Sequence, residues 1–320
     1  MPHPLLGTRF SRLSVAEIRK MIAETRSDDA VIERLSLDSR AGVRAIVRSL
    51  VRGRERMRRL DGRFDEMLAI ERTLRSAGHC CIAGLDEAGR GPLAGPVTVG
   101  CVILPEDARL PGLDDSKKLT PSNREEMYAR IVETARAWCV VVESHLEIDE
   151  LGILGAVMKG MRGAVECLAL RPDMALVDGN VEPGLACMER AIVDGDARCV
   201  SIAAASVLAK VTRDRIMAEL DARWPAYGFA GHKGYGCRKH VEAIRAHGPC
   251  EMHRFSFHTV IEEAPPGTVR AALEMRLRNA RSAEELECAA NGIRRNSGRI
   301  REKDLEFLRE VYRACRKRFG

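Results

Sequence analysis

The middle of the chain, residues 77–264, alternates between short apolar segments and longer segments with helical periodicity. The apolar segments predict five strands, at Cys81–Leu85, Val97–Leu104, Cys139–Leu146, Met174–Val177 and Cys199–Ile202. The periodic segments predict helices at Pro121–Ala137, Ile148–Leu168, Ala203–Arg223 and Arg238–His247. No long helix fits before Pro121, whereas the later strands alternate with helices. A meander followed by βαβ units predicts an α/β fold with a mixed five-stranded sheet flanked by helices.

Charge divides the chain into three parts. Residues 1–76 hold 17 Lys and Arg against 11 Asp and Glu, and residues 265–320 hold 14 against 8, so each flank has a net charge of +6. The middle has a net charge of −6. Because Pro265-Pro266-Gly267 is typical of a linker, we expect a basic helical N-terminal extension over 1–76, a catalytic domain over 77–264 and a basic helical C-terminal appendage over 265–320.

The N-terminal extension is predicted to be helical and rich in arginine. Ser14 and Glu17 form a capping box, and apolar residues recur at helical spacing after it. A dense run of arginines follows, at Arg44, Arg48, Arg52, Arg54, Arg56, Arg58 and Arg59. Such a run is typical either of a solvated helix face or of a surface that binds nucleic acid, and the sequence leaves both open.

The C-terminal appendage offers no catalytic motif. Ser282 and Glu285 form another capping box, and Leu305, Leu308 and Tyr312 mark a last helix. We interpret this segment as a small helical unit that binds nucleic acid or a protein partner.

Composition disfavours several classes of protein. The longest apolar run, Val97–Leu104, is far shorter than the roughly 20 residues of a membrane-spanning helix, and Met1–Pro4 lacks the pattern of a signal peptide. The eleven cysteines are odd in number and show no Cys-x-x-Cys spacing, which disfavours a disulfide framework or a zinc knuckle. We expect a cytoplasmic protein without membrane association.

The segment Gly84–Pro96 carries most of the chemical information. Asp86 and Glu87 end a predicted buried strand, and a Gly-Arg-Gly turn follows them. A strand followed by Gly-x-Gly also opens a dinucleotide-binding motif, but here prolines and a second strand follow instead of a helix that would hold a pyrophosphate. Nucleotide cofactors are therefore disfavoured.

Acids at the ends of several strands predict a metal site. Asp178 ends the fourth predicted strand and Asp196 precedes the fifth, so chain reversals place both beside Asp86 and Glu87. Carboxylates that share a site raise one another's pKa, and a divalent cation relieves their repulsion. Hard oxygen ligands suit Mg²⁺ or Mn²⁺. Taken singly, each Asp is also typical of a turn, and for Asp194 we favour that interpretation.

The adjacency of Asp86 and Glu87 sets a geometric condition. Neighbouring side chains on a regular strand point to opposite faces of the sheet. Both can serve one site if the strand ends or bulges at Glu87, and we expect Gly89 to permit such a break.

Six motifs follow one another in the middle region. They are Asp-Glu-Ala-Gly-Arg-Gly-Pro-Leu-Ala-Gly-Pro (86–96), Asp-Ser-Lys-Lys-Leu-Thr (115–120), Val-Asp-Gly-Asn (177–180), Ser-Ile-Ala-Ala-Ala-Ser-Val-Leu-Ala-Lys-Val-Thr-Arg-Asp (201–214), Gly-His-Lys-Gly-Tyr-Gly (231–236) with His240, and His-Arg-Phe-Ser-Phe (253–257). With them the chain resembles bacterial ribonuclease HII, the type 2 ribonuclease H family, over about residues 80–260. The N-terminal extension looks like the one that precedes the catalytic domain in some members, with a looser match.

The resemblance implies an RNase H-like fold and a nuclease that uses two divalent ions, Mg²⁺ or Mn²⁺. The family's metal-binding acids fall on Asp86, Glu87, Asp178 and Asp196, with Asp86 bridging the ions. The turn that reads the ribose 2′-hydroxyl through backbone groups falls on Gly89, Arg90 and Gly91, and the stacking tyrosine falls on Tyr235. Cys237 stands where threonine or serine is more usual in the family.

Basic side chains within the same motifs are candidates for phosphate contacts. They are Lys117, Lys118, Lys210, Arg213 and Lys233. Asp214 lies beside Lys210 and Arg213 in a predicted helix, and we interpret it as a structural acid that pairs with a base.

The resemblance also implies the reaction and the substrates. The expected activity cleaves the RNA strand of RNA–DNA hybrids and incises duplex DNA 5′ of embedded ribonucleotides, leaving 3′-hydroxyl and 5′-phosphate ends, as in ribonucleotide excision repair. A ribonuclease HIII-like hybrid nuclease and a non-catalytic nucleic-acid-binding protein remain as alternatives. The Gly-Arg-Gly turn disfavours the first, and the presence of all four acids disfavours the second.

Overall fold

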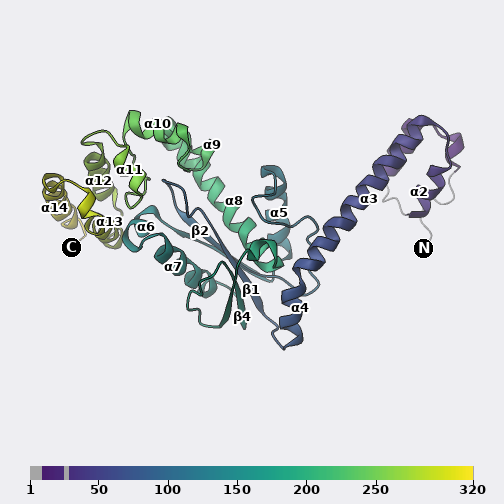
Figure 1. Ribbon diagram of the computed structural model, residues 1–320, viewed down its shortest axis with the longest axis horizontal. Coiled ribbons are helices and arrows are strands. Elements are labelled where there is room, and N and C mark those ends of the chain that lie inside the picture. The colour runs from purple at the N-terminus through teal and green to yellow at the C-terminus, as the bar shows by residue number, and fades with distance from the viewer. Residues whose placement is uncertain (1–8, 25–28, 320) are drawn as a thin grey trace. The chain divides into compact units, whose positions relative to one another are not determined.

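Two units make up the chain, residues 1–65 and residues 66–320, in a computed structural model that describes residues 9–24 and 29–319 (Figure 1). The first unit is helical, with the 3-10 helix η2 (Phe10–Arg12), α1 (Val15–Glu24), α2 (Asp29–Ser36) and the long α3 (Ala41–Met67). None of the helices formed by the described residues is both long and apolar enough to cross a membrane.

The first unit has a small core of its own and a basic surface. Its buried side chains come from all four helices and are Phe10, Ile18, Val31, Leu35, Val43 and Ile46. The predicted capping box is present, since Ser14 N donates to Glu17 Oε2 (2.7 Å) and Glu17 N donates to Ser14 Oγ (3.2 Å). The whole predicted arginine run lies on α3, and all of its members except the half-buried Arg54 are exposed.

The second unit begins with α4 (Ala69–Ser76) and is built around one sheet. The strands are β1 (Ile82–Ala88), β2 (Val97–Ile103), β3 (Ala137–Glu143), β4 (Met174–Asp178) and β5 (Met188–Ile192). Their order in the sheet is β3-β2-β1-β4-β5. The pairs β1–β2 and β2–β3 are antiparallel, whereas β1–β4 and β4–β5 are parallel. The predicted mixed sheet, a meander followed by parallel strands, is confirmed.

Helices and short turns complete the second unit. In chain order as far as α8 they are α5 (Pro121–Thr134), α6 (His145–Leu151), α7 (Ile153–Glu166), the 3-10 helix η3 (Gly195–Ala197) and α8 (Val200–Arg223). After it come η4 (Pro225–Tyr227), α9 (Phe229–His232), α10 (Arg238–His247), α11 (His258–Glu262), α12 (Thr268–Asn279), α13 (Ala283–Arg295), η5 (Ser297–Arg299) and α14 (Glu302–Arg316).

The fifth strand was predicted in the wrong place. Cys199–Ile202 begins α8 instead, because an apolar run of four residues fits a buried helix as well as a strand. The edge strand next to β4 is β5. A hydrophobicity pattern does not identify it, because Met188 is exposed and Glu189 and Arg190 are charged.

Two further boundaries differ from the prediction. The third strand ends at Glu143, and Ser144 caps α6 through a capping box with Glu147, so Leu146 is helical. The helix predicted over Ile148–Leu168 is two helices, broken at Gly152, where φ is +77°. This left-handed conformation favours glycine.

Helix α8 packs closely on one face of β1 and β2, because two glycines on these strands have no side chains that would collide with its backbone. A Cβ on Gly84 would lie 2.1 Å from the carbonyl carbon of Ser201, and one on Gly100 would lie 2.3 Å from the carbonyl oxygen of Ala205. Side chains of α7, such as Val157 and Met161, pack with Leu85 and Val99 in the core of the opposite face. The sheet therefore lies between two helical layers.

The C-terminal appendage shares a core with the catalytic region. Leu273, Leu286 and Leu308 pack in one cluster with Ile244 and Phe255. The predicted cap at Ser282 is present, but the Glu285 carboxylate accepts from Arg281 N, so the box is only half formed.

One buried ion pair joins the appendage to the rest of the unit. Arg276 Nη1 of α12 lies 2.8 Å from Asp149 Oδ2 of α6, and both side chains are almost fully buried. Asp149 also accepts from Phe255 N, Ser256 N and Ser256 Oγ. Arg276 donates in turn to the carbonyls of Glu251 and His253.

We expect Arg276→Met to destabilise the protein by about 3 kcal/mol, because the variant leaves the Asp149 carboxylate buried without its cation. Arg278→Met removes an exposed pair with Glu274 on the same helix and should cost less than about 1 kcal/mol. Urea unfolding of the two variants measures both effects. Equal costs would contradict a special role for the buried pair.

A second buried acid, Glu71 of α4, caps the N-terminus of α8. Its Oε1 accepts from Ser201 N (3.0 Å) and Ser201 Oγ (2.8 Å), while Oε2 has no partner among the described residues. Burial raises the pKa of Glu71, and the bonds from Ser201 and the charge of Arg75 offset this only in part.

Glu71→Gln should remove a pH dependence of stability while keeping an oxygen acceptor for Ser201. Because the pKa of Glu71 is higher in the folded state, its contribution is full below the unfolded pKa and is lost as pH rises through the folded pKa. The free energy of unfolding of the wild type, relative to the variant, should therefore fall between a pH below 4.5, the ordinary pKa of the group, and a pH above its raised folded-state pKa. Urea unfolding at both pH values tests this, with exposed Glu133→Gln as control, and a pH-independent difference would refute it.

Candidate active site

The parallel pair β1–β4 brings acids to one edge of the sheet. Its pairing runs to Leu85 opposite Val177, and Asp86 and Asp178 are the next residues on the two strands. Asp196 joins them from η3, because Gly195 N donates to Asp178 Oδ1 at 2.7 Å and ties η3 to the end of β4.

The expected break at Glu87 is wrong. The β1–β2 register continues without interruption through Glu87 opposite Val99 and Ala88 opposite Thr98. Alternation therefore places Asp86 on the α8 face with Gly84 and Glu87 on the other face. Both side chains nevertheless line one cavity, because the pairing with β4 stops before them and opens this edge of β1.

The four acids share one region of negative potential. Burial raises the pKa of Asp86 well above its usual range, and the charges of Glu87 and Asp178 raise it further. Burial and Asp178 also raise the pKa of Glu87, which Arg90 lowers in part. The pKa of Asp196 is raised by burial, then by Asp115 and Asp178.

Protein cations already compensate two of these acids. Arg90 Nη1 lies 3.2 Å from Glu87 Oε1, and Lys117 Nζ lies 3.5 Å from Asp196 Oδ2. Over residues 9–24 and 29–319, no group of three or more acidic, histidine or cysteine side chains is arranged so that it could hold a metal ion. The donors themselves are carboxylates, whose oxygens are the hard ligands that Mg²⁺ and Mn²⁺ prefer.

A cavity of about 380 Å³ lies elsewhere, between α13 and α14, but the cavity at these acids measures ≈ 460 Å³ and holds the predicted recognition residues. Its lining includes Asp86, Glu87, Gly89, Arg90, Gly91, Lys117, Lys210 and Tyr235. Asp178 and Asp196 do not line the cavity. The charge of Asp178 acts on Asp86, which does line it, and Asp196 contacts the lining residue Lys117.

Three polar lining residues were not assigned from the sequence. Ser116 and Ser206 have their hydroxyl oxygens 2.7 Å apart, and Arg124 Nε donates to the Ser116 carbonyl at 2.8 Å. Both serines belong to quoted motifs, so the motifs signalled them, whereas Arg124 stands in a helix of ordinary polar composition.

The lysines differ in their placement. Lys117 and Lys210 line the cavity, but Lys118 pairs with Asp114 (3.2 Å) and does not. Lys233 does not line it either, and it contributes its carbonyl to Arg213.

The interpretation of Asp214 as a structural acid agrees with its contacts. Its carboxylate accepts from Lys210 Nζ at 2.6 Å and from Arg124 Nη1 at 3.1 Å. Burial lowers the pKa of Lys210, and Asp214 partly restores it.

Arg213 cannot contact phosphate, contrary to the prediction, because it is fully buried. Its guanidinium donates to the carbonyls of Pro96 (2.9 Å), Lys233 (3.0 Å) and Ala94 (3.2 Å). It also fills the space beside Gly89, where a Cβ would lie 2.0 Å from Arg213 Nε and φ is +100°. Only glycine fits there.

A second buried guanidinium, that of Arg254, holds the Gly-Arg-Gly turn. Arg254 donates to the carbonyls of Gly89 (2.7 Å), Arg90 (3.0 Å), Pro92 (2.8 Å), Gly95 (2.9 Å) and Pro96 (3.0 Å). Burial lowers the pKa of Arg254 to about 9, which still leaves the group charged at neutral pH. The motif at 253–257 contained Arg254, but nothing in the sequence assigned it this role.

Tyr235 lies beside the same turn. A Cβ on Gly91 would lie 3.5 Å from Tyr235 Cε1, and the tyrosine is 46% exposed. Its loop is fixed to the turn segment because Leu93 N donates to the Gly234 carbonyl at 2.8 Å. An exposed ring on a fixed loop can serve as a stacking surface.

Comparisons with known proteins agree with this fold. The profile of the family described as "Ribonuclease HII" matches residues 83–260, and that of the "Ribonuclease HII N-terminal domain" matches residues 14–75. "Ribonuclease HII" of Geobacillus kaustophilus is 47% identical over 253 residues, which cover 79% of this chain and 97% of the relative. That of Burkholderia vietnamiensis is 54% identical over 194 residues, which cover 61% and 86%.

A solved structure shares the fold. The ribonuclease H2 from Pyrococcus horikoshii superposes with a TM-score of 0.50 at 28% identity, over 57% of this chain and 96% of that one. The similarity therefore extends over nearly the whole of the solved protein. The chain belongs to the ribonuclease HII family of nucleases, and its five-stranded sheet has the RNase H-like fold.

Proposed function

We propose that this nuclease uses divalent metal ions to cut the RNA strand of RNA–DNA hybrids and to incise duplex DNA 5′ of embedded ribonucleotides, leaving 3′-hydroxyl and 5′-phosphate ends. The observation that carries the proposal is the cavity where Asp86 and Glu87 lie with Gly89–Gly91 and Tyr235. It joins acids suited to phosphodiester hydrolysis with groups suited to recognising a ribose.

Asp86, Glu87, Asp178 and Asp196 would hold two divalent cations once their side chains turn toward one another, because among the described residues they do not form a group that could hold a metal ion as they stand. When bound, these ions would neutralise the scissile phosphate and activate water. The chain's own contribution is a set of carboxylates in which burial first, and neighbouring acids second, raise the pKa of Asp86, Glu87 and Asp196; a bound cation would favour their charged forms. Arg90 forms a salt bridge with Glu87, and Lys117 forms one with Asp196. Both salt bridges would have to break for these acids to bind a metal ion.

The Gly-Arg-Gly turn supports recognition of the 2′-hydroxyl. Arg254 occupies the carbonyls of Gly89 and Arg90, whereas within the described part of the chain the N–H groups of Arg90 and Gly91 donate to no protein acceptor. These N–H groups are available to a hydroxyl, which distinguishes RNA from DNA at one nucleotide. Gly91 has no side chain that would block a close approach of the sugar.

Two basic residues support binding of the phosphate backbone near the cut. Lys117 and Lys210 line the cavity together with the serine pair Ser116–Ser206. The exposed arginines of α3 would extend this binding along the nucleic acid. We propose that residues 1–76 act as a substrate-binding extension of a catalytic domain over 77–264.

Asp86→Asn should abolish cleavage, with a loss of at least about 10³-fold, because it removes a buried carboxylate from the metal-binding set. Asp194→Asn is the matched control, since Asp194 has a left-handed backbone (φ 54°) that Asn also adopts. The assay compares an RNA–DNA hybrid, a duplex with one ribonucleotide and an all-DNA duplex, each with Mg²⁺ or Mn²⁺. Cleavage of plain DNA, or no incision at the single ribonucleotide, would overturn the proposed substrates.

Neutralising Arg52, Arg56 and Arg59 to Gln should weaken hybrid binding and flatten its salt dependence. Each lost phosphate contact reduces the slope of log K against log salt by about 0.7–0.9. Arg281, Lys303 and Lys317 to Gln is the control, with the same charge change on the exposed appendage. Fluorescence anisotropy over a salt series measures the slopes, and an unchanged slope would reduce the arginine run to a solvated helix face.

A further inference from the structure

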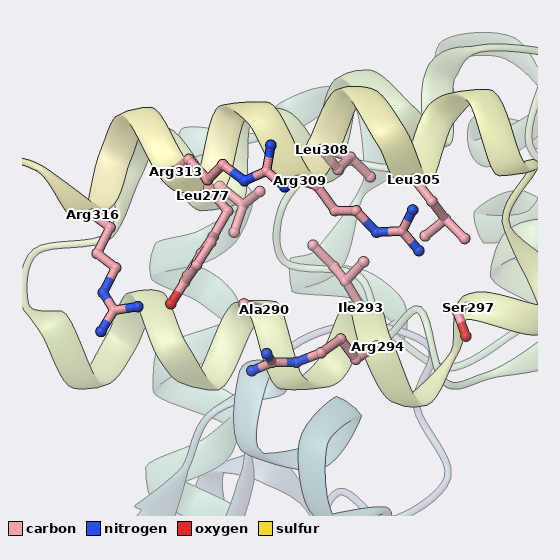
Figure 2. A pocket seen from close by; sticks show the side chains of 11 residues that line it. Leu277, Ala290, Ile293, Arg294, Ser297, Leu305, Leu308, Arg309, Arg313 and Arg316 are labelled. Carbon is pink, nitrogen blue, oxygen red and sulfur yellow. The ribbon is translucent and has the colours of Figure 1, made fainter.

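The appendage contains a groove that the nuclease site does not use. It lies between α13 and α14, has a volume of ≈ 380 Å³, and belongs to residues beyond 260, where neither family profile matches (Figure 2). Its floor is apolar and consists of Leu277, Ala290, Ile293, Leu305, Leu308 and Tyr312. A volume of this size accommodates bulky apolar side chains.

Arginines surround this apolar floor. Arg294 lies on α13, and Figure 2 shows Arg309 and Arg316 extending from α14 into the space between the helices. Arg313 completes the lining. The groove thus combines an apolar floor with four guanidinium groups.

Two of these four guanidinium groups form salt bridges with acids, and the charge of Arg316 also acts on Glu287. Arg294 pairs with Glu287 and Arg309 pairs with Glu302, each at 3.1 Å. Over the described residues, neither Arg313 nor Arg316 forms a salt bridge. These two stand three positions apart on α14, about 4.5 Å along the helix axis, and both are exposed.

The groove is part of a fixed surface. The floor residues Leu277, Leu305 and Leu308 are buried members of the core that the appendage shares with the catalytic region. The Arg276–Asp149 pair holds α12 beneath them. A ligand therefore meets a preformed groove and loses less entropy in ordering it.

We propose that this groove binds an acidic amphipathic helix of a partner protein. The partner would place leucine-like side chains on the floor and Asp or Glu against Arg313 and Arg316, as in helix-in-groove recognition. A duplex fits the features less well, because its phosphates need cations but would leave a 380 Å³ apolar cavity uncovered. The inference does not depend on the proposed nuclease substrates.

The test uses the full-length protein and a fluorescent helical peptide of about 16 residues. The peptide carries leucines at helical spacing and glutamates on both flanks of the leucine stripe. Comparison probes are the same composition in scrambled order, the peptide with Lys for Glu, the peptide with Ser for Leu, and a duplex DNA. Fluorescence anisotropy should show at least about tenfold tighter binding of the acidic amphipathic peptide than of the other three peptides.

Two charge-reversal variants locate the binding. Arg313→Glu with Arg316→Glu should weaken binding of the acidic peptide about tenfold, whereas Lys303→Glu with Lys317→Glu, the same charge change outside the groove lining, should alter it less than about twofold. Thermal unfolding confirms that both variants fold. Equal binding of the scrambled peptide would overturn the proposal. So would loss of duplex binding in the arginine variant without peptide binding in the wild type, which would assign the surface to nucleic acid.

Discussion

The candidate active site of this ribonuclease HII family member depends on a guanidinium, that of Arg254, buried among backbone carbonyls. Residues 89–96 form an irregular segment rich in glycine and proline, and such a segment cannot pair its carbonyls in a sheet. Arg254 supplies donors to five of them, and Arg213 adds donors to Pro96 and Ala94. Guanidinium has five N–H donors in a planar fork, so it can satisfy several carbonyls at once. Without these bonds the turn would carry unpaired buried groups.

This arrangement fixes both the shape and the polarity of the turn. Arg254 binds the carbonyls of Gly89 and Arg90, whereas the N–H groups of Arg90 and Gly91 donate to no acceptor within the described part of the chain. The same two arginines set the glycine at position 89, because Arg213 occupies the space that a side chain would need. The loop that carries Tyr235 is held by two hydrogen bonds. The Lys233 carbonyl accepts from Arg213, and the Gly234 carbonyl accepts from Leu93 N. Recognition groups from distant parts of the chain are thus held by one hydrogen-bonded centre.

The acids differ from the turn, because the fold holds them close together although their negative charges repel one another. Burial and the charges of Glu87 and Asp178 raise the pKa of Asp86. The parallel pairing of β1 with β4 fixes Asp86 close to Asp178, because each residue directly follows the last paired position of its strand. Such a cluster favours binding of cations over stability. The appendage adds support at a distance, since Arg276 binds the His253 carbonyl next to Arg254. The residues that line its groove between α13 and α14 do not include Arg276.

The prediction of the fold succeeded where one local pattern has one meaning. The strands at β1, β2 and β4 are bounded by glycine, proline or acids, and their positions were correct within a few residues. It failed at Cys199–Ile202, where a short apolar run is compatible with a strand or a buried helix, and at β5, whose edge position tolerates charged residues. The choice in both places rests on packing, because α8 needs the space that Gly84 and Gly100 leave free.

The sequence by itself determined the acids, the glycine turn, the family resemblance and the division of charge, because these are properties of residue type and order. Only the tertiary structure decided that Glu87 reaches the site without a bulge, that Arg213 is structural, and that Arg254 holds the turn. A side chain's role as ligand or support depends on its burial and on the partners within about 3 Å. In the turn segment, the partners of Arg213 and Arg254 are 117 to 165 positions away in the chain, and they become partners only when the sheet and α8 bring them together.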